Sequence, residues 1–230
     1  MRMAAQGRLA FAALLMGAAF IGFAPVFVKL ALQDDHGAFG PSAIAFYRVA
    51  IAWPAFAMWM KSSRKSVQPH VDSRRKSRWL LTLAGVFFAA DLAAWHWSIK
   101  FTTVANATLL ANAAPLWVTA WAWALFGERP GRAFYPALAL ALGGAAMLLE
   151  ASFQLSPTRL LGDFLGLVTA MCYGSYMLCV GRLRRSWSTP EVMAWSGMVA
   201  APLLLLTALL SGDRMLAADP SGWGVLVGLA

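Results

Sequence analysis

Charged residues are scarce in this sequence, where they make up 13% of 230 positions. Soluble globular domains carry about twice that share, so the chain is poorly suited to a surface that faces only water. Acidic residues are the rarer sign, and the formal net charge is +9. The basic residues lie in short segments between apolar blocks, which is typical of topology determinants in membrane proteins. We therefore expect no nucleic-acid partner, in spite of the positive charge.

Cysteines and recognisable catalytic motifs are also few. The two cysteines, Cys172 and Cys179, fall inside one apolar block and form neither a disulfide framework nor a CxxC pair. The sequence lacks HExxH, GxSxG, a glycine-rich phosphate loop and any paired metal-ligand motif. These absences argue against the enzyme classes that depend on such motifs. We expect a protein that is not an enzyme and that needs neither a cofactor nor a metal ion.

Long apolar runs dominate what is present, since 60% of the residues are hydrophobic. The runs are about twenty residues long, the length that an α-helix needs to cross a bilayer. We predict an all-α polytopic membrane protein with complete spans at residues 9–32, 40–60, 79–99, 104–126, 132–150, 162–181 and 190–210. An eighth span begins near Ser221, but the chain stops at Ala230, too soon to cross, so we expect a shortened form of a longer protein.

The distribution of Lys and Arg predicts the orientation of the chain. Alternate loops and the N-terminal segment hold most of the basic residues, with the longest basic loop between Lys61 and Arg78. The opposite loops hold only Lys100, Arg159 and Arg214. Because cytoplasmic loops carry the excess of positive charge, we predict a cytoplasmic N-terminus in the cell (inner) membrane, with the lipid bilayer as a partner.

A weak internal repeat relates the two parts of the chain. FIGFAPVFVKL (20–30) aligns with YGSYMLCVGRL (173–183), and RVAIAWP (48–54) aligns roughly with GMVAAP (197–202). Five predicted spans separate the two copies, and an odd number inverts the second copy in the membrane. Inverted repeats are typical of secondary transporters, whose sites lie near the bilayer midplane where the repeats meet.

The fourth predicted span carries the most specific resemblance to a known family. TTVANATLLANAAPLWVTAWAWALFGERP (102–130), followed by a helix that ends in GGAAMLL (143–149), resembles the EamA-type family of the drug/metabolite transporter (DMT) superfamily. Lys29, the FYR at 46–48 and the GD at 162–163 fit the same family.

The resemblance implies ten spans arranged as inverted five-helix repeats, here residues 1–150 and an incomplete second repeat at 162–230. It also implies that the protein moves a small metabolite, often outward. The expected function is secondary transport of a small polar metabolite or amino-acid-like solute by alternating access, with export favoured. The sequence leaves open whether the protein forms a homodimer. Two other functions also stay open: a membrane-embedded enzyme that uses Asp91 and His96, and a non-transporting, truncated membrane scaffold.

Asp91 and Arg48 are the charged candidates for substrate binding or coupling. Asp91 lies in the apolar stretch VFFAADLAAWHW, roughly 18 Å from the start of its span, and Arg48 lies roughly 12 Å into the span before it. The two opposite charges are therefore expected at similar depth, where an isolated charge costs on the order of 3 kcal/mol or more. Asp91 is either a proton- or substrate-coupled carboxylate or one half of an architectural ion pair. Arg48 either binds an anionic group or neutralises Asp91.

Two further candidates lie near the ends of their spans. His96 is about 140° around the helix from Asp91, so the two side chains do not share a face. His96 is either a substrate contact or an interfacial side chain between Trp95 and Trp97. Lys29 either contacts the substrate or extends its amine to the interface.

Polar stripes on the fourth and sixth spans supply the remaining candidates. Thr108, Asn112, Pro115 and Thr119 share one face, which either lines the substrate or packs closely against another helix. Pro115 has no N–H, so one carbonyl in the preceding turn needs another partner or water. Tyr176 lies on a second such face, and the resemblance implies that its helix lines a central cavity.

Overall fold

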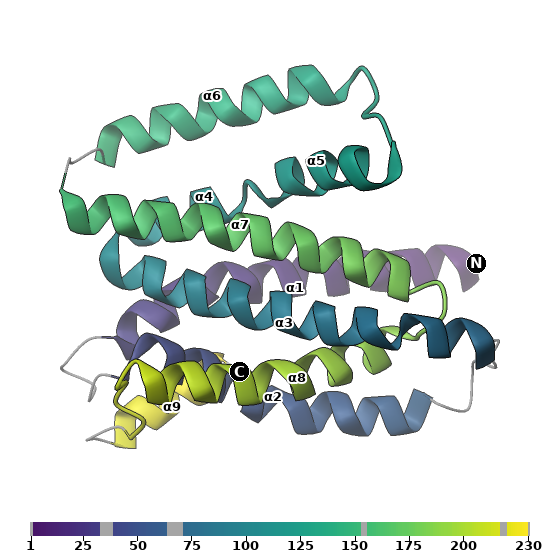
Figure 1. The fold of residues 1–230 in the computed structure, drawn as a ribbon, viewed down its shortest axis with the longest axis horizontal. Coiled ribbons are helices and arrows are strands. Elements are labelled where there is room, and N and C mark those ends of the chain that lie inside the picture. The colour runs from purple at the N-terminus through teal and green to yellow at the C-terminus, as the bar shows by residue number, and fades with distance from the viewer. Residues whose placement is uncertain (1, 33–38, 64–70, 153–155, 217–219, 230) are drawn as a thin grey trace.

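The computed structural model describes residues 2–32, 39–63, 71–152, 156–216 and 220–229. Every regular element in these ranges is an α-helix, which confirms the predicted all-α class. The helices are α1 (Arg2–Ala31), α2 (Pro41–Ser63), α3 (Val71–Phe101), α4 (Val104–Ala111), α5 (Ala114–Phe126), α6 (Phe134–Ser152), α7 (Pro157–Leu183), α8 (Thr189–Leu210) and α9 (Pro220–Leu229). Figure 1 shows them running roughly side by side, with α6 at one edge of the bundle and α2, α8 and α9 at the opposite edge.

Six helical segments in the described ranges are long and apolar enough to cross a membrane. One of them, Val104–Phe126, comprises both α4 and α5, and α6 adds a shorter apolar stretch at Phe134–Gly144. Six of the seven predicted spans overlap these segments, whereas the predicted span at 132–150 falls on α6, where only the shorter apolar stretch is found. Several helices also extend beyond the predicted spans. α3 begins at Val71 instead of residue 79, and α7 begins at Pro157 instead of residue 162. Part of the predicted basic loop from Lys61 to Arg78 is therefore helical, and its residues 64–70 lie outside the described ranges.

The sequence fixes several helix ends by local chemistry. The hydroxyl oxygen of Ser156 accepts a hydrogen bond from the backbone N–H of Arg159 and starts α7. Glu191 Oε2 accepts from the backbone N–H of Ser188 at 2.9 Å, and the two residues form a capping box at the start of α8. Gly127 ends α5 with φ 69°, a backbone conformation that residues with a Cβ rarely adopt.

α3 is the central helix of the bundle. It packs most extensively against α7 and also against α8, while α2 packs along α8. Gly162 lets α7 approach the turn between α3 and α4, since a Cβ at this position would lie 2.7 Å from the backbone nitrogen of Thr102. At the same contact Thr102 Oγ1 donates to Asp163 Oδ1 at 2.7 Å, and Ser98 Oγ donates to the carbonyl of Gly162 at 2.7 Å. Asp163 thus links α7 to the turn between α3 and α4.

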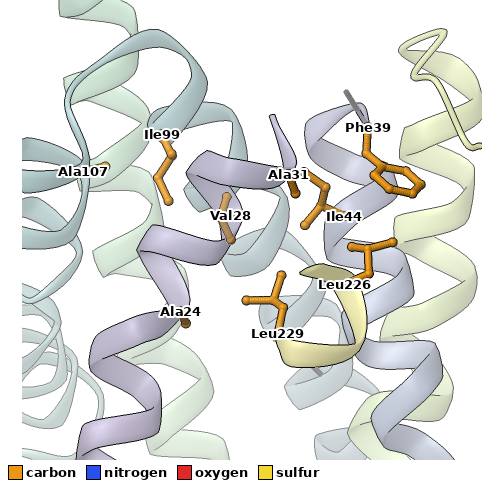
Figure 2. Packing of buried hydrophobic residues seen from close by; sticks show 9 residues of the cluster. All are labelled: Ala24, Val28, Ala31, Phe39, Ile44, Ile99, Ala107, Leu226 and Leu229. Carbon is orange, nitrogen blue, oxygen red and sulfur yellow. The ribbon is translucent and has the colours of Figure 1, made fainter. Parts of the chain in front are cut away.

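One end of the bundle is sealed by an apolar cluster drawn from α1, α2, α3, α4 and α9, and we call it the closed end. Val28, Ile44, Ile99 and Leu226 have no exposed surface within this cluster. Figure 2 shows Ile44, Leu226 and Leu229 together on one side of α1, and Ile99 with Ala107 on the other side. Burial of these apolar groups joins the first helices to α9.

A hydrogen-bonded connection reinforces the closed end. Asp213, which follows α8, accepts hydrogen bonds through Oδ2 from the backbone N–H groups of Ser42 at 2.6 Å and Ala43 at 3.3 Å. Tyr47 donates its hydroxyl proton to the carbonyl of Met215 at 2.9 Å. The carboxylate satisfies free N–H groups at the start of α2, so the segment after α8 is fastened to that helix.

Candidate functional site

A cavity of about 490 Å³ lies between α1, α2, α3, α4, α7 and α8. Its volume is within the range of small-molecule sites, roughly 300–1,000 Å³. The apolar cluster of the closed end forms one wall, because four cavity residues each have a cluster member one turn away on their own helix. These pairs are Ala24 with Val28, Arg48 with Ile44, Trp95 with Ile99, and Ala111 with Ala107.

Asp91 and Arg48 both line this cavity. Asp91 is only 8% exposed, and the two charged groups are close enough to interact electrostatically. Within the part of the chain that the structure describes, no hydrogen bond or ion pair joins them. The two residues therefore share one cavity, but the architectural ion pair that we considered is not formed between them.

Trp95 holds the guanidinium of Arg48. The Cζ atom of Arg48 lies over the indole ring at 5.7 Å from its centroid, a distance typical of a cation–π contact. Trp95 is four residues after Asp91 and therefore lies one turn closer to the closed end on the same face of α3. The indole thus holds the guanidinium on the same face of α3 as Asp91.

Three of the other predicted residues, Asn112, Thr108 and Tyr176, also line the cavity. The Tyr176 hydroxyl contacts Met193 Sδ at 3.6 Å. Thr108 Oγ1 is buried and has no hydrogen-bond partner among the described residues. In addition to the two charges, the cavity therefore offers polar groups from α4 and its C-cap (Thr108 and Asn112) and from α7 (Tyr176).

The predicted fourth span is interrupted where it reaches the cavity. Asn112 and Ala113 separate α4 from α5, and Pro115 lies in the first turn of α5. The missing N–H of Pro115 explains the break. The predicted stripe is divided by it: Thr108 and Asn112 face the cavity, whereas Thr119 does not line it and donates to the carbonyl of Pro115 at 2.9 Å.

An aromatic wall was not predicted from the sequence. Phe88 stacks on Tyr176 with ring centroids 5.1 Å apart, and Tyr173 stacks on the same tyrosine at 6.4 Å. Trp53 and Phe56 extend the apolar lining along α2. Helical periodicity was the available signal, since Phe88 is three residues before Asp91 and Tyr173 is three residues before Tyr176.

His96 and Lys29 lie outside the cavity lining. His96 is completely buried, so its interpretation as an interfacial side chain is wrong. Its Nδ1 donates to the carbonyl of Leu92 at 2.6 Å, and its Nε2 has no partner in the described part of the chain. Lys29 is half-buried on α1. His96 does not line the cavity that Asp91 lines, so this cavity does not bring the two side chains together.

The sequence matches the model of the EamA-like transporter family over residues 8–150 and 160–230. The chain belongs to this family. This confirms the resemblance carried by the fourth span and identifies an EamA-family, multi-pass membrane protein of the DMT superfamily.

Named relatives of this EamA-family chain are transporters. The pseudopaline exporter CntI of Pseudomonas aeruginosa is 26% identical over 203 residues, covering 88% of this chain and 68% of that protein, in strains UCBPP-PA14 and PAO1. An uncharacterized transporter of Archaeoglobus fulgidus is 25% identical over 195 residues, covering 81% of this chain and 62% of that protein. A solved crystal structure has the same fold, with a TM-score of 0.62 and 21% identity over 93% of this chain and 75% of that chain.

Proposed function

We propose that the protein is a secondary transporter that exports a small polar metabolite or amino-acid-like solute by alternating access. The observation that carries this proposal is the cavity, in which Asp91 and Arg48 face the same space without neutralising each other. Charges buried in a membrane bundle are costly, and they are typical of substrate and ion pathways. The printed name of the Pseudomonas aeruginosa relative, an exporter, supports the outward direction.

The architecture of the cavity also supports alternating access. The cavity is sealed toward the closed end by Val28, Ile44 and Ile99, each fully buried. On the other side α1 is loosely packed, since Phe20 is 73% exposed and Ile21, which lines the cavity, is 70% exposed. With the N-terminus in the cytoplasm, as the basic loops predict, the closed end faces outward and the described conformation is shut on that side.

Two inverted repeats provide the route between conformations in this proposal. The family model aligns with residues 8–150 and again with 160–230, close to the predicted repeats at 1–150 and 162–230. Helices of both segments, α3 and α7 above all, enclose the cavity between them. A site at the junction of two repeats becomes accessible from either side when the repeats rock against each other. The inner membrane location belongs to the same proposal.

The test is extracellular metabolite profiling of bacteria that overexpress the complete gene. The variant is Asp91→Asn, and the matched control is Asp163→Asn, which changes the same chemical group on α7 outside the cavity. We expect one solute to accumulate outside cells with the wild type and the control, and to stay at background with Asp91→Asn at equal membrane abundance. Equal export by all three proteins would mean that Asp91 has a structural role and is not needed for transport. An unchanged profile with the wild type would contradict export and favour the scaffold.

A further inference from the structure

We propose that α5 and α6 form a binding surface for one anionic phospholipid, with an acyl chain between the two helices and the headgroup phosphate on Arg129, Arg132 and Arg182. No residue of α5 or α6 lines the cavity described above. The lipid surface is therefore separate from the candidate solute site and does not depend on the transport proposal.

α6 is an apolar helix that the rest of the bundle hardly covers. Its main packing contact is with α4, and every residue from Tyr135 to Gly144 except Leu138 is exposed. A helix that packs on a bundle hides one stripe of its circumference, whereas these consecutive positions include all faces of α6. A Cβ at Gly143 or Gly144 would also meet nothing within 4 Å. Side chains therefore do not fill the space on the bundle side of α6, which lies at one edge of the molecule (Figure 1).

The last turn of α5 is open and apolar in the same way. Trp123, Leu125 and Phe126 are all exposed, as are Tyr135 and Leu140 on α6. These side chains lie on either side of the short loop that joins the two helices. Apolar surface of this kind is unfavourable in water and favourable against hydrocarbon. An acyl chain has the width and chemistry to occupy the space between the two helices.

Three arginines lie where this apolar surface ends. Arg129 and Arg132 are exposed in the loop between α5 and α6, and Arg182 is half-buried in the last turn of α7. None of the three forms an ion pair with another residue that the structure describes. Glu128 is the one acidic residue in the loop, so three positive charges stand against one negative charge. This balance complements the phosphate of an anionic lipid.

Arg182 is held at the apolar surface instead of extending into water. Its Cζ atom lies 3.1 Å from the ring centroid of Phe126, the last residue of α5. A cation–π contact uses the face of the guanidinium, and the N–H groups at its edge stay able to donate to a phosphate. An arginine that only determines topology needs no such position, because its charge acts from a solvated loop. The contact thus places a phosphate-binding group beside the apolar wall of α5.

An anionic lipid fits this surface better than a second copy of the chain. Two copies in one membrane, related by a twofold axis along the bilayer normal, would bring Arg129, Arg132 and Arg182 to the same depth in both copies. Like charges at an interface repel each other. A phospholipid instead supplies the negative charge and the apolar chain in one molecule.

The experiment is native mass spectrometry of the purified chain in detergent, titrated with dioleoyl phosphatidylglycerol or dioleoyl phosphatidylcholine. The two lipids have the same acyl chains, and only the first has a net negative charge. We expect phosphatidylglycerol to bind at least about tenfold more tightly, since each arginine near an anionic lipid contributes about fivefold in affinity. Inorganic phosphate should not displace it, because phosphate lacks the acyl chain.

Two variants and one control assign the binding to this surface. Arg182→Gln should weaken phosphatidylglycerol binding about fivefold, and Arg129→Gln combined with Arg132→Gln should weaken it at least as much, with phosphatidylcholine binding unchanged in both. The double variant lies in a loop and disturbs no helix packing. Arg214→Gln is the control, because Arg214 is exposed in the segment after α8, at the opposite end of the bundle (Figure 1), and it should bind both lipids as the wild type does.

Four results would overturn the lipid surface. These are equal affinity of the wild type for the two lipids, displacement of phosphatidylglycerol by inorganic phosphate, an equal loss in Arg214→Gln, and a dimer of the chain that carries no bound lipid.

Discussion

Replacement of Gly162 by alanine tests the close contact between α7 and the turn that joins α3 to α4. The new Cβ would lie 2.7 Å from the backbone nitrogen of Thr102, 2.8 Å from its Cβ and 2.9 Å from the carbonyl carbon of Phe101. Two of these neighbours are backbone atoms, which cannot rotate away as a side-chain end can. Insertion of a methyl group into such a contact typically costs about 1–3 kcal/mol.

Two other terms adjust this value. The displacement of α7 would lengthen the hydrogen bonds from Thr102 Oγ1 to Asp163 and from Ser98 Oγ to the Gly162 carbonyl, both 2.7 Å in the native structure. Interhelical hydrogen bonds in membranes are worth about 0.6 kcal/mol each. Alanine in place of a helical glycine returns about 1 kcal/mol through lower backbone entropy. We therefore expect Gly162→Ala to lower the free energy of unfolding by about 1–3 kcal/mol.

The assay is equilibrium unfolding in mixed micelles with increasing SDS, followed by tryptophan fluorescence. Gly181→Ala is the matched control, because Gly181 lies on the same helix and a Cβ there meets nothing within 4 Å. The control should be neutral or more stable by up to about 1 kcal/mol. If Gly162→Ala were as stable as Gly181→Ala, the close approach of α7 to this turn would be wrong.

Two further substitutions test contacts that join segments far apart in the sequence. Asp213→Ala removes the acceptor for the N–H groups at the start of α2 and should destabilise the protein by about 0.5–2 kcal/mol, with a smaller loss for Asp213→Asn. Thermal unfolding of nanodisc samples measures both losses, and an unchanged melting temperature in both variants would contradict this cap. Trp53→Phe removes the donor to the Ala194 carbonyl and should lower the free energy of unfolding by about 0.5–1.5 kcal/mol. The control is Trp59→Phe, because Trp59 is half exposed on the same helix, and it should leave this free energy unchanged. Equal effects of the two substitutions would exclude a specific hydrogen bond between α2 and α8.

The helical class and most span positions were predictable because hydrophobic length is a local property of the sequence. Helix ends were less accurate, since the helices run beyond the apolar stretches that define the spans. α3 begins at Val71, within a basic segment that hydropathy assigns to a loop. The break between α4 and α5 could be anticipated from Pro115, which lacks the N–H that a continuous helix needs.

The candidate site was predictable in its charges and less so in its contacts. Asp91 and Arg48 stand out in apolar spans, and the rise per residue places them at similar depth. The sequence does not show that the indole of Trp95 holds Arg48, because the rotation of α2 relative to α3 depends on packing among several helices. For the same reason the sequence did not show that His96 is fully buried away from the cavity lining.

Protection from thiol labelling tests the central claim, that this cavity holds the solute of a transporter, most directly. Thr108→Cys would be introduced after replacement of Cys172 and Cys179 by alanine, with Thr119→Cys as the control on the same span outside the cavity. The account predicts that the exported solute slows labelling of the residue 108 thiol several-fold, in a concentration-dependent manner, and leaves the residue 119 thiol unchanged. Equal labelling of the residue 108 thiol with and without the solute, in a protein that still exports it, would contradict the account.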